Sequence, residues 1–131
     1  MSRPRSIRVA AIGAALVVLT FVAFFGVTSN AFLNYDDDVY VTDNPHVLGG
    51  LNGAGVGWAL TSTDAANWHP LTWMSHMLDA QLFGLDAGKH HLTSLLIHAL
   101  NVVLLFLLLV RMTGALWRPA FVAALFAIHP L

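Results

Sequence analysis

The chain has 131 residues, of which 57% are hydrophobic and only 10% are charged, and its formal net charge is −1. Together with a mean hydropathy of +0.70, this composition lies outside the range of an ordinary soluble globular domain. The net charge gives no indication of nucleic-acid binding, and a chain without cysteine can form neither a disulfide framework nor a thiolate metal site.

The first predicted element is an apolar helix over residues 7–28, long enough to cross a bilayer. Residues 1–6 include Arg3 and Arg5, and the positive-inside rule places them in the cytoplasm. A cleaved signal peptide is the alternative, with a cut after Ala31, since Ser29 and Ala31 are small residues at the −3 and −1 positions. The apolar run is longer than a usual signal core, so a retained membrane anchor is favoured.

Residues 29–90 form a polar loop that contains every acidic residue and the single lysine, whereas every arginine lies outside it. This distribution predicts that the loop is extracytoplasmic. Its acid-rich start, Asn30 to Tyr40, predicts no regular element, and Asn44 and Pro45 mark a turn. The glycine-rich stretch after Pro45 is expected to be flexible, although Val56 to Leu60 could form a short helix.

A clearer helix is predicted to begin at Pro70, where a missing amide hydrogen costs nothing, and to end at Gly84. One helical face carries an apolar stripe made of Leu71, Met74, Leu78 and Leu82. This pattern is typical of an amphipathic helix in the membrane interface, and packing of the helix on the protein itself is an equal alternative.

The second predicted span covers residues 91–110, followed by a cytoplasmic turn over residues 111–118 that contains Arg111 and Arg118. Residues 119–131 begin a third apolar segment that is too short to span, so we expect a fragment of a longer protein. The predicted fold is therefore an all-α membrane protein with two full transmembrane helices, the start of a third, and a long extracytoplasmic loop carrying short interfacial helices.

Four polar side chains share one face of the second span: His91, Ser94, His98 and Asn101. Lipid solvates such groups poorly, so this face should contact other helices or a water-filled cavity. Hydrogen bonding between helices is the favoured interpretation, and contact with a substrate or a carrier headgroup is the alternative.

Three adjacent acids, Asp36, Asp37 and Asp38, stand where the first span should leave the membrane. They fit a solvated flank, and they also fit a general base beside a ligand for a cation or substrate. The histidines show no zinc-hydrolase spacing and the chain has no glutamate, so no metal site is predicted. Aspartate and histidine could nevertheless hold one divalent ion together with a ligand phosphate.

Four motifs in order make the chain resemble one family. They are NYDDDVY from Asn34, NWHPLTW from Asn67, HLTSLLIH from His91 and LFAIHP from Leu125. In this order they resemble the N-terminal part of bacterial membrane proteins related to the transmembrane and tetratricopeptide-repeat O-mannosyltransferases. The resemblance implies a multi-span C-type glycosyltransferase of the cell (inner) membrane, often followed by tetratricopeptide repeats. Such an enzyme transfers a sugar from a polyprenyl-phosphate carrier to a protein or glycan acceptor on the extracytoplasmic side.

By motif position, the resemblance assigns the catalytic carboxylates to Asp36 and Asp37, and the extra acid Asp38 leaves the register open. Positive charge or hydrogen-bond donors should stabilise the phosphate leaving group, and His69, His91 and His98 are the candidates. No cofactor follows from the motifs, although a divalent metal is compatible with them. The alternative function is a noncatalytic membrane anchor or scaffold for C-terminal repeats.

Overall fold

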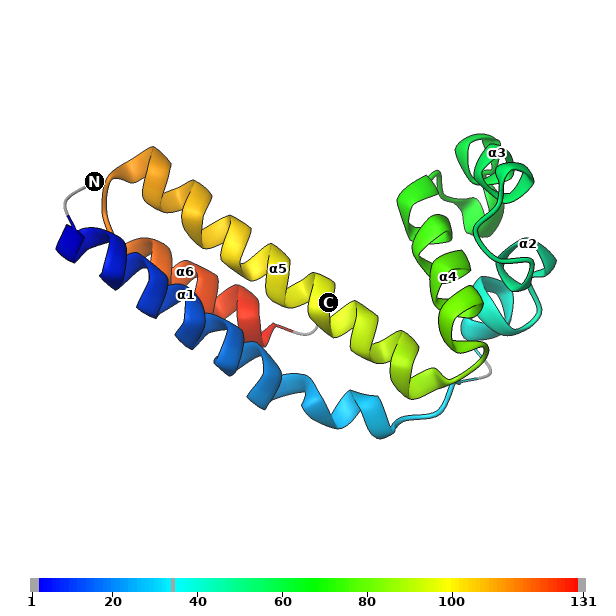
Figure 1. Ribbon diagram of the computed structural model, residues 1–131, viewed down its shortest axis with the longest axis horizontal. Helices are drawn as coiled ribbons and strands as arrows, with labels where there is room; N and C mark the ends of the chain where they lie inside the picture. Colours follow the sequence, from blue (N-terminus) through cyan, green and yellow to red (C-terminus); the bar gives the residue numbers. More distant parts are fainter. Residues whose placement is uncertain (1–2, 34, 130–131) are drawn as a thin grey trace. The chain divides into compact units, whose positions relative to one another are not determined.

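The computed structural model describes residues 3–33 and 35–129, and every regular element among them is a helix. This confirms the all-α prediction. The elements, in chain order, are α1 (Arg3–Phe24), η1 (Phe25–Ser29), η2 (Asp38–Thr42), α2 (Pro45–Leu48), α3 (Gly53–Thr61), η3 (Asp64–Ala66), α4 (Pro70–Phe83), α5 (Ala87–Thr113) and α6 (Trp117–Ile128) (Figure 1). They form two compact units, which we call the bundle unit (residues 1–27 and 94–131) and the loop unit (residues 28–93).

Two helical segments are long and apolar enough to cross a membrane, namely Pro4–Ser29 with 26 residues and Ala87–Thr113 with 27. They coincide with the predicted spans 7–28 and 91–110, but both extend beyond them. Helix α5 continues into the predicted turn at 111–118 as far as Thr113, and α6 begins at Trp117, so only residues 114–116 separate the two helices. Gly114 allows this sharp connection because its φ of +69° is open to glycine.

The third apolar helix, α6, has 12 residues, fewer than the roughly 20 that a span requires. A third crossing is therefore not established, and Pro130 lies outside the described residues. In the bundle unit, α1, α5 and α6 share a core of Leu16, Val102, Phe106, Val110, Ala123 and Ala127. Figure 1 shows α1 and α6 running alongside each other.

The start of the loop unit is more ordered than the sequence suggested. The prediction of no regular element over Asn30 to Tyr40 is wrong at its end, because the single-turn π-helix η2 begins at Asp38. Asn44 does more than mark a turn, since its side-chain oxygen accepts hydrogen bonds from the backbone N–H groups of His46 (3.0 Å) and Val47 (3.3 Å). This cap and the proline at the first helical position start α2.

Helix α4 begins at Pro70 and is followed by Gly84 at a φ of +62°, as predicted. The face that it buries is not the predicted leucine stripe. Trp73 and Met77 are fully buried in a core with Val41, Val47 and Ala59. Of the predicted stripe, Met74 packs against this core, whereas the three leucines face outward: Leu71 is 79%, Leu78 42% and Leu82 61% exposed. Helix α4 therefore packs on the loop unit and presents a second apolar face outward.

Candidate functional site

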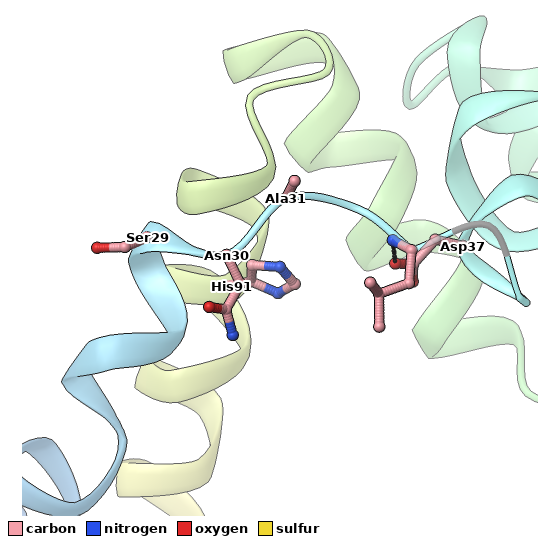
Figure 2. A pocket seen from close by; sticks show the side chains of 6 residues that line it. Ser29, Asn30, Ala31, Asp37 and His91 are labelled. Atoms are coloured by element: carbon pink, nitrogen blue, oxygen red, sulfur yellow. Dashed lines mark hydrogen bonds between the residues drawn. The ribbon is translucent and has the colours of Figure 1, made fainter.

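A pocket of about 510 Å³ opens at the beginning of the loop unit. It is lined by Ser29, Asn30, Ala31, Leu33, Asp37 and His91 (Figure 2). Figure 2 shows Ser29, Asn30 and Ala31 along the segment that leaves η1, while His91 comes from α5. The pocket therefore forms where the chain leaves the first apolar helix and passes the start of the second.

Asp37 is the only one of the three adjacent acids that lines the pocket. It is half-buried, and its Oδ2 accepts a hydrogen bond of 2.8 Å from the backbone N–H of Leu33. Asp36 is exposed, and Asp38 Oδ1 accepts from the adjacent N–H of Val39 at 2.9 Å. The local turn thus orients the carboxylate of Asp37 and separates it from its two neighbours.

His91 contributes an imidazole to the same pocket. Its ring is half-buried and lies 6.0 Å from the ring of Phe32, measured between centroids. Its Nε2 atom is shielded from solvent and has no hydrogen-bond partner among the described residues. A ring nitrogen without a partner keeps its hydrogen-bonding capacity, and a rotation of the His91 side chain would expose it to an incoming polar group.

Two other predicted site residues lie elsewhere. His69 belongs to an aromatic cluster in the loop unit, with its ring 5.5 Å from Tyr40 and 4.9 Å from Trp73. His98 is buried in the bundle unit, where its Nε2 lies 3.3 Å from the carbonyl oxygen of Ala127 near the end of α6. The pocket lining thus unites Asp37 and His91, but includes neither Asp36 nor His69 nor His98.

The predicted polar face of the second span is not buried as a whole. Of the four residues only His98 is buried; His91 is half-buried, and Ser94 and Asn101 are exposed. The hydrogen bond from His98 to α6 agrees with the favoured interpretation, an interaction between helices.

A group of three residues was not singled out from the sequence. His76 and Asp79 on α4 and His90 on α5 each offer one ligand atom, and these atoms all lie within 4.8 Å of one another. These three residues do not follow a zinc-hydrolase spacing, so that pattern did not predict the group. His76 and Asp79 are three residues apart and therefore share a helical face, which was a usable signal in the sequence.

The surroundings of His76 lower its pKa. Burial is the largest cause, and the neighbouring imidazoles of His90 and His69 add to it, while Asp79 and Asp37 act in the opposite direction.

Comparisons with protein-family models, curated proteins and solved structures found no match to this chain. The family resemblance therefore depends on the four motifs alone. Their residues Asn34 and Pro130 lie outside the described residues.

Proposed function

We propose that the chain forms the N-terminal part of an integral membrane glycosyltransferase. The enzyme would move a sugar from a polyprenyl-phosphate carrier to an acceptor on the extracytoplasmic side of the cell membrane. The observation that carries the proposal is the pocket shared by Asp37 and His91, directly after the first apolar helix. The motif resemblance supplies the reaction class.

In this proposal Asp37 is the general base. Glycosyl transfer requires removal of a proton from the acceptor hydroxyl, and a positioned carboxylate can accept it. The N–H of Leu33 orients the Asp37 carboxylate through Oδ2. Its Oδ1 is then the oxygen that receives the proton.

His91 has the complementary role. Its Nε2 has no hydrogen-bond partner in the described part of the chain, so it can donate to a phosphate oxygen when it carries a proton. A donor aimed at the departing phosphate stabilises the charge that develops there. Asp37 would thus assist the bond that forms to the acceptor oxygen, and His91 the bond that breaks to the carrier phosphate.

The membrane arrangement is part of the proposal. Segments Pro4–Ser29 and Ala87–Thr113 would cross the bilayer, with residues 30–86 outside and the arginines in the cytoplasm. Ser29 both ends the first segment and lines the pocket, so a carrier phosphate could reach Asp37 while its polyprenyl tail stays in lipid. The exposed leucine face of α4 would rest in the membrane interface.

The full-length protein tests the proposal. Asp37→Asn should lower sugar transfer from a polyprenyl-phosphate donor by roughly 10²–10⁴-fold, because it removes the proton acceptor. Asp43→Asn is the matched control, since Asp43 is exposed, lies in the same unit and is absent from the pocket. Asp36→Asn should resemble this control.

Membrane insertion of each variant is measured in parallel by carbonate extraction. Near-normal transfer by an inserted Asp37→Asn protein would eliminate Asp37 as the base. Near-normal transfer by all three variants would favour the noncatalytic anchor or scaffold instead.

A further inference from the structure

We propose that His76, Asp79 and His90 form a binding site for a divalent transition-metal ion, and that zinc best matches the donor set. The site lies in the loop unit, on two consecutive helices joined by the turn at Gly84. It goes beyond the proposed transferase function, because it requires neither the Asp37 pocket nor a sugar carrier.

The spacing of the ligand atoms fits a metal ion. All three lie within 4.8 Å of one another. A tetrahedral zinc ion with bonds of about 2.0–2.2 Å brings its ligand atoms to roughly 3.4 Å from one another. Small side-chain rotations close this difference, since His76 and Asp79 lie on one side of α4 and His90 faces them from α5.

The hydrogen bond of His90 leaves its Nδ1 atom available to bind a metal ion. Its Nε2 lies 2.9 Å from the carbonyl oxygen of Gly84, and a carbonyl can only accept, so Nε2 carries the hydrogen. The Nδ1 atom then has a lone pair, and like Nδ1 of His76 it is buried without a partner among residues 3–33 and 35–129. His90 is only 4% exposed, so water does not readily satisfy this nitrogen. A metal ion would satisfy both.

A hydrogen bond also fixes the carboxylate of Asp79. It is 4% exposed, and its Oδ1 accepts a hydrogen bond of 2.8 Å from the hydroxyl of Thr93. Metal-binding histidines and carboxylates usually have such second hydrogen bonds, which fix their orientation. Within the described residues the only side-chain ion pair joins Lys89 to Asp86, so no cationic side chain neutralises Asp79. A divalent cation would do so.

The donor set selects the metal. Two imidazole nitrogens and one carboxylate oxygen suit zinc and its neighbours in the first transition row, whereas calcium and magnesium prefer oxygen ligands. Three protein ligands leave a fourth position for water or for another oxygen ligand. The site is thus of the open type, in contrast to the closed four-ligand sites that serve structure alone.

Metal binding can be measured directly on the purified full-length protein in detergent. After treatment with a chelator and titration with zinc chloride, the protein should retain about one zinc ion per chain, determined by mass spectrometry of the metal. His76→Gln, Asp79→Asn and His90→Gln should each abolish this stoichiometric binding. His46→Gln should bind like the natural sequence, because His46 is exposed and stacks on Trp58 outside the group.

Thr93→Val protects the test against simple misfolding, since valine keeps the shape of threonine and removes only the hydroxyl that holds Asp79. It should weaken zinc binding by about 10–100-fold without abolishing it. Zinc should also raise the thermal unfolding midpoint of the natural sequence but not of His90→Gln. Absence of bound zinc in the natural protein, or equal binding by the three ligand variants, would overturn the proposal. Neither result bears on the Asp37→Asn assay.

Discussion

The guanidinium of Arg5 donates a hydrogen bond to the carbonyl oxygen of Gly114, which lies 109 positions later in the chain. Gly114 directly follows the last residue of α5, and Arg5 lies near the start of α1. The arginine-bearing ends of these two helices therefore meet at one end of the bundle unit. This is the arrangement that the positive-inside rule requires if both ends are cytoplasmic.

Cysteine labelling checks this orientation, because the chain has no cysteine of its own. We expect Thr63→Cys to react with a membrane-impermeant thiol reagent in intact cells, since Thr63 is exposed in the loop unit. Met112→Cys, at a position 72% exposed near the end of α5, should react only after the membrane is opened. The reverse labelling pattern would invert the topology. A mature N-terminus at Phe32, found by mass spectrometry, would instead show signal cleavage.

The outward leucine face of α4 should contact lipid. Spin labels at Leu71→Cys, Leu78→Cys and Leu82→Cys should collide more often with oxygen, which dissolves in lipid, than with a water-soluble paramagnetic reagent. A label at Thr63→Cys should show the opposite preference, since Thr63 is exposed and belongs to no apolar stripe. If the water-soluble reagent dominates at all three leucine positions, this face is solvated and the interfacial assignment fails.

Residue 88 has to be glycine, because the backbone of Thr28 lies close to it at the start of α5. A Cβ atom added there would clash with the carbonyl oxygen of Thr28, and a backbone atom cannot rotate away. Gly88→Ala should therefore destabilise the protein by about 1–3 kcal/mol. Gly57→Ala is the matched control, because it lies inside α3 with nothing within 4 Å of the added Cβ.

The control substitution should be neutral or stabilising by up to about 1 kcal/mol, since alanine favours helix. Thermal unfolding of both variants in detergent measures the difference. Equal midpoints for Gly88→Ala and Gly57→Ala would show that α5 does not pass Thr28 as described.

Stability should fall on acidification because of His76. Its pKa lies below the ordinary value of 6.5, chiefly through burial and next through the neighbouring His90, with a smaller contribution from His69; Asp79 and Asp37 oppose the shift. The folded state therefore binds a proton less readily than the unfolded state, so protonation favours unfolding. The contribution of His76 should be constant above pH 6.5 and should become destabilising as the pH falls below it.

Thermal midpoints in the presence of a chelator, recorded from about pH 7.5 down to about pH 5, would show this decline. His76→Gln should flatten the decline, because glutamine does not titrate. A profile unchanged by this substitution would assign the pH dependence to other groups.

Local signals in the sequence were sufficient for several elements. Sustained hydrophobicity marks the two long helices, because an apolar segment of that length depends little on its neighbours. Pro70 and Gly84 bound α4 because each restricts or permits backbone angles at its own position. The motif resemblance and the adjacent acids pointed to the start of the loop, where the Asp37 pocket lies.

Other features were decided only by tertiary structure. Helix α4 has two apolar faces, and hydrophobicity alone does not tell whether Trp73 or Leu82 finds a partner surface; the core around Val47 buries Trp73. Likewise, the hydrogen bond from Leu33 selects Asp37 over Asp36, although the two side chains are chemically identical. Sequence sets what each residue can do, whereas burial and ligation require atoms from distant segments to meet, and only the folded chain fixes those distances.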